Sequence, residues 1–278
     1  MTRSDTRLPL SFHMTFQPER HYLTALLKFA QTQTSGTIDG ISQVTGIPTG
    51  KSTGKVKPLL QYAQGMGLLE IGPTSDGLQK FALTSLAHAI LREDPHLLEE
   101  NTQWALHLML CGRRGGAEVW YAVFVEAANI LGRAFPEAQF EQFLVNRYGS
   151  SRDAVGPLFR TYADSAAFAN AGAIACDNGR ITLRRVPTQP ALIDTVAALL
   201  LLAWDEAAPN DTQVALSALE ASSGLLAATG WGLEEQSQLL TEMESRGLLH
   251  VDRQTGNPIL TRLISTDQVL RTMYERLV

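Results

Sequence analysis

The sequence predicts a mainly α-helical protein, and three observations support this class. Apolar residues recur at helical spacing in most segments of the chain. Two segments, one near each end, have instead the turn residues and short strand-like stretches of a β-hairpin. The 278 residues, 45% hydrophobic and 18% charged, can form packed cores for more than one small domain. We expect a winged helix-turn-helix at residues 1–95, a helical middle domain at 96–187 and a second winged-helix-like domain at 188–278.

The first domain has three predicted helices followed by a hairpin. Apolar spacing predicts helices over residues 19–32, 37–44 and 52–65. Pro58 fits the third helix only if that helix starts within about three residues before it, or is kinked, because proline lacks the N–H that a helix interior needs. The segment 67–84 has two strand-like halves around the turn GPTSDG. Three helices and a hairpin are the order of a winged helix-turn-helix.

The rest of the chain is predicted from the same signals. The middle domain has aromatic-rich helical patterns, and its last two helices are joined by the turn YGSS. The C-terminal domain repeats the order of helices and then a hairpin, with QTGN as the turn. The predicted helices of the two domains span about residues 101–110, 117–131, 138–147, 151–163, 189–206, 212–220, 233–246 and 267–277.

Charge is distributed unevenly along the chain. The first 80 residues contain eight Lys and Arg against five Asp and Glu, a local charge of +3, and they include all the lysines. From residue 191 to the end there are five Arg against twelve acids, a local charge of −7. Chance variation among small domains would also produce such a difference. The asymmetry favours different partners for the two ends, with phosphate at the basic end and protein at the acidic end.

The basic residues gather in the turn before the third helix. No acidic residue occurs between Gly40 and Gly67. Lysines, hydroxyls and the backbone N–H groups of a helix N-terminus are the groups that contact DNA phosphates and groove edges. An ordinary solvated turn is the alternative. The candidate contacts to duplex DNA are Thr49, Lys51, Ser52, Thr53, Lys55 and Lys57.

A nucleotide-binding loop is the competing interpretation of GIPTGKST at 46–53. Such a loop has the pattern G-x-x-x-x-G-K-[ST], in which the first glycine stands five residues before the second, and it follows a strand. Here Thr45 occupies the first glycine's place, and the segment before it has a helical pattern. We therefore expect neither nucleotide binding nor any other cofactor.

The sequence has no arrangement that is typical of catalysis. The six histidines form no HExxH pair, and His107 is expected to pack in a helix interface. The cysteines, Cys111 and Cys176, are too few for a zinc cluster or a disulfide framework. No G-x-S-x-G motif occurs. We therefore expect that the protein is not an enzyme.

The C-terminal domain is expected to bind protein rather than DNA. Its third helix is rich in glutamate, which phosphate would repel. Apolar residues that a small domain could leave uncovered lie nearby, although Trp231 could equally be core. A protein partner or a second copy of the chain is the expected ligand. The residues concerned are Glu234, Glu235, Glu242, Glu244, Leu225, Leu226 and Trp231.

Targeting signals are not apparent. The N-terminus lacks the apolar core of a secretion signal. The longest apolar stretch, residues 196–204, is about half as long as a membrane span. We expect a soluble, cytoplasmic protein without a membrane partner.

Several short motifs together resemble a known family. They are LSFHMTF at 10–16, the glycine-lysine turn at 46–57, LTSLAHAILREDP at 83–95, the Trp104–His107 and Trp120–Tyr121 pairs, and SSRDAVGPLFRTY at 150–162. Their order and spacing are similar to those of the prokaryotic domain-of-unknown-function family 4007.

The resemblance implies a setting rather than an activity. Members of that family tend to be encoded in bacterial defence or mobile islands, some beside DNA-modification genes. With the basic turn, this favours a non-catalytic DNA-binding accessory protein. The alternative is a protein-interaction adaptor whose winged helices bind partner subunits.

Overall fold

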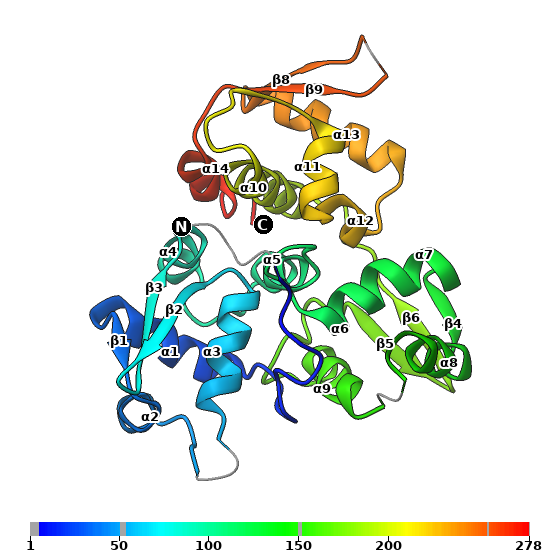
Figure 1. Cartoon of the computed structure of the whole chain (residues 1–278). Helices are drawn as coiled ribbons and strands as arrows, with labels where there is room; N and C mark the ends of the chain where they lie inside the picture. The colour runs from blue at the N-terminus through cyan, green and yellow to red at the C-terminus, as the bar shows by residue number, and fades with distance from the viewer. Residues whose placement is uncertain (1–5, 51–53, 150–151, 255, 278) are drawn as a thin grey trace.

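Three units with similar element order follow one another along the chain. The computed structural model describes residues 6–50, 54–149, 152–254 and 256–277. Within the first unit, three helices precede a β-hairpin, and a two-residue strand separates the first helix from the second (Figure 1). Its elements are α1 (Arg20–Thr32), β1 (Ser35–Gly36), α2 (Ile38–Thr45), α3 (Val56–Gly65), β2 (Leu69–Ser75) and β3 (Leu78–Leu83).

The second unit follows two linking helices, α4 (Ser85–Glu93) and α5 (Glu100–Leu110). It begins with a helical run that contains a π-helical segment. Its elements are α6 (Glu118–Tyr121), the π-helix η1 (Ala122–Ala127), α7 (Ala128–Leu131), β4 (Ala134–Pro136), α8 (Glu137–Tyr148), α9 (Arg152–Ala163), β5 (Ile174–Asp177) and β6 (Arg180–Leu183).

The third unit begins with the longest helix among the described residues and ends with a helix after its hairpin. Its elements are α10 (Pro190–Ala207), β7 (Gln213–Ala215), α11 (Leu216–Ser223), α12 (Leu225–Thr229), α13 (Leu233–Ser245), β8 (Leu249–Asp252), β9 (Ile259–Arg262) and α14 (Thr266–Thr272).

Each unit contains a small antiparallel sheet of three strands. In each sheet the short first strand pairs with the last strand of the hairpin, so the orders are β1-β3-β2, β4-β6-β5 and β7-β9-β8. The predicted mainly α class is therefore wrong, because the fold is α+β. The helical middle domain is also wrong, since β4, β5 and β6 form a sheet there. The three residues of β4 are too few to show a clear alternation in the sequence, and this strand ends in a proline, which is rare in strands.

Local sequence explains how α2 and α3 begin and end. The hydroxyl of Thr37 accepts a hydrogen bond from the amide of Gly40 (3.0 Å) and caps α2. Gly46 ends that helix with φ of 71°, a conformation that glycine adopts without steric cost. The third helix begins at Val56, so Pro58 lies in its first turn, where the missing N–H would have no partner within the helix. The expectation of a start close to Pro58 is confirmed.

The units share one hydrophobic core. At its centre lies α5, in which residues 101 to 110 are all buried (Figure 1). The C-terminal end of the chain is fixed to this helix, because Asn101 Nδ2 donates to the carbonyl of Met273 (3.1 Å) and Thr102 Oγ1 lies 2.7 Å from Tyr274 Oη. Residues far apart in the sequence therefore stabilise the same centre.

Residues 6–19, the N-terminal strap, run between the first and second units (Figure 1). Leu8 begins this contact, since its amide donates to the carbonyl of Gly116 and its carbonyl accepts from the amide of Glu118. Phe12 and His13 are buried, and the ring of Phe12 contacts those of Tyr62 and Trp120. The strap thus joins α3 to the helical run of the second unit.

Candidate nucleic-acid interface

The basic turn, residues 46–57, connects α2 to α3 and is anchored at both ends. Ile47 is fully buried, and its carbonyl accepts a hydrogen bond from the hydroxyl of Ser42 (2.7 Å). The amide of Lys55 donates to the carbonyl of Pro48 (2.8 Å). These contacts hold the two ends of the turn together at the N-terminus of α3, where the helix dipole favours an anion.

The structure separates the predicted contact residues into three groups. Thr49 and Lys57 are exposed, and among the described residues no carboxylate lies within ion-pair distance of Lys57. Lys55 is partly buried and occupied by a contact within the protein. Lys51, Ser52 and Thr53 lie outside the described residues.

Lys55 contacts the N-terminal strap. Its Nζ is 2.5 Å from Glu19 Oε1, and it lies 5.6 Å and 5.1 Å from the ring centroids of Phe16 and Tyr22. Its side chain is 24% exposed and that of Glu19 is 19% exposed. Sequence reasoning missed this pair because Glu19 is 36 positions away, so no local spacing indicated it. The contact leaves Lys57 as the described lysine of the turn that faces solvent.

A second cation approaches the strap from α9. Arg160 is exposed, and its Nη2 donates to the carbonyl of Thr15 (2.7 Å). The sequence gave no sign that Arg160 would lie near the first unit, because 145 positions separate it from Thr15. The strap creates this proximity.

Buried aromatic residues form the support beneath the strap. His107 Nδ1 is 2.6 Å from Tyr162 Oη, and Trp120 Nε1 donates to the same hydroxyl (2.8 Å). Burial lowers the pKa of His107 to about 3, so its imidazole is neutral at pH 7. The expectation that His107 packs in a helix interface is confirmed. Among the residues that the structure describes, no group of three His, Cys, Asp or Glu side chains could hold a metal ion.

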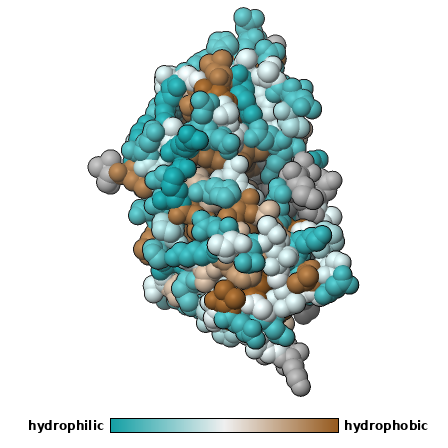
Figure 2. Space-filling view, turned by 90° about the vertical axis from the view of Figure 1, so that its left-hand side faces the viewer, coloured by the Kyte–Doolittle hydropathy of each residue, from teal (hydrophilic) through white to brown (hydrophobic). Residues whose placement is uncertain are grey.

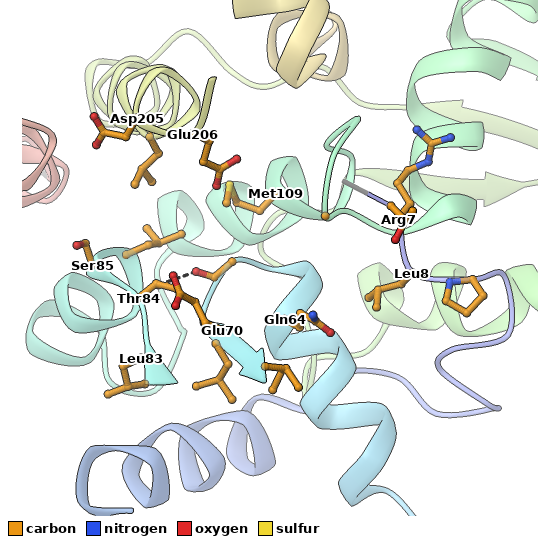
Figure 3. Close-up of a pocket in the computed structure, with 18 residues that line it drawn as sticks. Arg7, Leu8, Gln64, Glu70, Leu83, Thr84, Ser85, Met109, Asp205 and Glu206 are labelled. Carbon is orange, nitrogen blue, oxygen red and sulfur yellow. Dashed lines mark hydrogen bonds between the residues drawn. The ribbon is translucent and has the colours of Figure 1, made fainter. Parts of the chain in front are cut away.

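A cavity of about 630 Å³ lies between the first unit, the strap and α10 (Figure 3). Its lining includes the carboxylates of Glu70, Asp205 and Glu206. The cation in the lining, Arg7, binds Glu118 (Nε–Oε2 2.6 Å), and Asp205 binds Arg262 (2.5 Å). Carboxylates repel phosphate, so we place no nucleic-acid contact in this cavity.

The apolar residues expected to form a docking surface on the third unit are buried. Trp231 is 6% exposed, and its Nε1 donates to the carbonyl of Val186 (2.7 Å). Leu225 and Leu226 are also buried. The prediction that these side chains are left uncovered is wrong, because α5 and η1 pack against α12 and Val186 accepts a hydrogen bond from Trp231, so segments outside residues 188–278 cover this domain.

Most of the glutamates on α13 bind cations within the chain. Glu235 binds Arg185 (3.3 Å), Glu242 binds Arg276 (2.6 Å) and Glu244 binds Arg253 (2.9 Å). The acidic face is therefore less charged than the sequence suggested. Leu233, at the start of α13, is the exception to the buried apolar set and is 87% exposed.

Hydrophobic surface on the face shown in Figure 2 occurs as several separate areas among hydrophilic residues. In the described part of the chain, none of the helices is both long enough and apolar enough to cross a membrane.

Comparisons with known proteins concern the fold. No family model matches the chain, and no curated protein matches it. The fold is similar to a magnesium-ion-bound crystal structure of SspB, with a TM-score of 0.72 and 19% identity over 95% of this chain and 86% of that one. A second SspB crystal structure has a TM-score of 0.73 and 18% identity over 99% of this chain and 88% of that one. The chain is thus similar in fold to these SspB structures over nearly its whole length.

Proposed function

We propose that the protein is a DNA-binding accessory protein of a bacterial defence or mobile-element system, and that it contacts duplex DNA through the basic turn. One observation carries this proposal. The turn presents Thr49 and Lys57 to solvent at the N-terminus of α3, in a stretch of 26 residues, 41–66, without an acidic side chain. Backbone N–H groups, a hydroxyl and a lysine at a helix start can together bind the phosphates of one strand.

The anchoring of the turn supports the same function. A phosphate contact contributes most when the protein groups are already held in place, because less conformational entropy is then lost on binding. Ile47, the Lys55–Pro48 hydrogen bond and the Lys55–Glu19 ion pair hold the two described ends of the turn in place before any ligand arrives. We therefore assign Lys55 to positioning, and Lys51 and Lys57 to phosphate.

The defence setting is proposed from the resemblance to the prokaryotic domain-of-unknown-function family 4007, and membership of that family is part of the proposal. The motif residues His107, Trp120 and Tyr162 meet in one buried cluster, and Phe12 contacts Trp120. These motif residues, which lie far apart in the sequence, therefore share one role in packing.

The test is duplex binding measured by fluorescence anisotropy at several salt concentrations. The logarithm of the binding constant should fall linearly with the logarithm of salt concentration, and each lost phosphate contact should reduce the slope by about 0.9. Lys57→Ala should weaken binding and reduce the slope by about one contact. The double variant Lys51→Ala, Lys57→Ala should lose about two phosphate contacts. Adding Lys55→Ala should reduce the slope by less than the 0.9 expected for one more phosphate contact.

A matched control is Lys28→Ala, which removes an exposed lysine of α1 outside the turn. This variant should keep the wild-type slope. Absence of duplex binding at low salt, or equal effects of Lys28→Ala and Lys57→Ala, would contradict the proposal. The proposal includes no catalytic step, so nicking or cleavage of a plasmid by the purified chain with Mg²⁺ would also contradict it.

A protein-interaction adaptor is the second candidate function, and the exposure of Leu233 favours it. An apolar side chain 87% exposed at the start of α13, beside Glu234, suits a partner or a second copy bound through residues 188–278. Light scattering of the full chain tests the second copy. A dimer that Leu233→Glu converts to monomer would support it, and a wild-type monomer at all concentrations would oppose it.

A further inference from the structure

We infer that the phosphate-binding surface extends from the first unit into the second, with Arg160 as its second cationic contact. This inference rests on the proposed function and names a part of the surface that the sequence did not identify. The ligand is the sugar-phosphate backbone of the same duplex that the basic turn binds.

The strap brings the two cationic elements to one stretch of chain. Lys55 of the basic turn lies against the ring of Phe16, whereas Arg160 donates to the carbonyl of Thr15. Thr15 and Phe16 are consecutive residues, with Cα atoms about 3.8 Å apart. Tyr62 of α3 also reaches this point, since its hydroxyl donates to the carbonyl of Phe16 (3.0 Å). The basic turn and the C-terminal end of α9 therefore border the same surface.

Further bonds fix the strap to the second unit, so the two elements hold a defined spacing. Gln17 Nε2 donates to Asp164, just after α9. Arg20, the first residue of α1 and directly after the strap, donates to the carbonyls of Ser165 (2.6 Å) and Ala167 (2.8 Å). A surface built from two units can follow a DNA strand only if the units do not shift relative to each other, and these bonds provide that constraint.

The guanidinium of Arg160 has more N–H donors than its contacts with the described residues use. In the described part of the chain it makes the single bond to Thr15, and no carboxylate lies within ion-pair distance of it. A guanidinium has several N–H donors in a planar fork that matches the oxygens of phosphate. Arg147 of α8 and Arg185, which follows β6, differ, because each of them binds a glutamate.

The acidic residues near this surface are held by other groups. Glu19 binds Lys55, and Asp164 accepts from Gln17 and from the amide of Ala166 (2.8 Å). Counting Lys55, Lys57 and Arg160 against Glu19 and Asp164 leaves a charge of +1, and Arg20 adds another positive charge. Phosphate is therefore attracted to the surface as a whole.

The test compares salt slopes for the full chain. Arg160→Ala should weaken duplex binding and lower the slope by about 0.9, and combining it with Lys57→Ala should lower it by about twice that. Arg160→Lys keeps the charge while changing the bond to Thr15, so it should retain the wild-type slope. The matched control is Arg180→Ala. Arg180 is also exposed and, among the described residues, binds a single backbone carbonyl, that of Ala134 (3.1 Å). It belongs to the β5–β6 hairpin, which lies away from the strap in Figure 1.

The outcomes separate this inference from the proposed function. If the wild type binds and Lys57→Ala lowers the slope, but Arg160→Ala leaves it unchanged, the inference is wrong and the proposed function stands. If Arg180→Ala lowers the slope as much as Arg160→Ala does, the inference is also wrong, because any surface arginine would then have the same effect. If the wild type does not bind duplex DNA, the proposed function itself fails.

Discussion

The ammonium of Lys55 lies 2.5 Å from the carboxylate of Glu19, and this ion pair joins the basic turn to the N-terminal strap. Both side chains are more than three-quarters buried, and the ammonium also faces the rings of Phe16 and Tyr22. Partial burial reduces the screening that weakens ion pairs on open surfaces. The pair therefore holds the C-terminal end of the basic turn against the strap.

Lys55 and Glu19 should be coupled in stability. Lys55→Met and Glu19→Gln should each lower the free energy of unfolding by about 1 kcal/mol, and the double variant should lose less than the sum of the two. Urea denaturation of the four proteins in the cycle measures the coupling. Lys57→Met is the control and should change stability little, because Lys57 is exposed. Additive losses would show that the two side chains act independently.

Stability should fall as the pH is lowered below about 6.5, and His107 should cause part of the fall. Burial holds its pKa near 3 in the folded protein, whereas an unfolded histidine has a pKa of about 6.5. Between these values the unfolded state binds a proton that the folded state does not, so folding loses up to about 1.4 kcal/mol per pH unit. Above the unfolded pKa this contribution is constant.

His107→Gln tests this pH dependence, since the amide can still hydrogen-bond Tyr162 but does not titrate. Urea midpoints at pH 7 and pH 4.5 should differ less for this variant than for the wild type. His21→Gln, which removes an exposed histidine, should keep the wild-type difference. Equal pH dependence in all three proteins would show that His107 does not cause the loss of stability at low pH.

Removal of the Asp194 carboxylate should destabilise the protein strongly. Asp194 on α10 is 1% exposed and binds Arg246 and Arg276, the latter with Nε at 2.7 Å. Asp194→Asn leaves two guanidinium groups without their main counter-charge, which should cost about 3 kcal/mol. Asp252→Asn, at the end of β8, is a milder comparison, and a similar loss for both would contradict the importance of the buried site.

Trp231 should contribute to folding rather than to partner binding. Its indole is buried and donates to the carbonyl of Val186 (2.7 Å). Trp231→Ala should lower the free energy of unfolding by about 3–5 kcal/mol, as large-to-small changes in cores do. Leu233→Ala should have little effect, because Leu233 is exposed. Chemical denaturation distinguishes the two residues.

Nucleotides should not bind the basic turn. The segment that precedes Gly46 is the helix α2, whereas a phosphate-binding loop follows a strand. Calorimetric titration with Mg-ATP or Mg-GTP should give no saturable heat. A micromolar dissociation constant that Lys51→Ala abolishes would show that the turn is a nucleotide site after all.

The sequence by itself determined the local elements of this protein. Apolar spacing placed a helix at residues 19–32, where α1 lies, and the turn GPTSDG placed the first hairpin. Proline chemistry placed the start of α3 near Pro58, because that constraint acts within one helical turn. Signals of this kind depend on neighbours in the chain, so a sequence can show them.

Only the tertiary structure decided which residues meet. The edge strand β4 is recognised by its pairing with β6. Its three residues are too few to show an alternation of apolar and polar side chains. Trp231 is core because distant segments cover it, and Lys55 is occupied because Glu19 folds back onto it. Arg160 binds the carbonyl of Thr15, next to the Phe16 ring that Lys55 faces, because the strap connects the two units. Contacts over long separations depend on how whole units pack, and this information is spread over the entire core rather than held in any one segment.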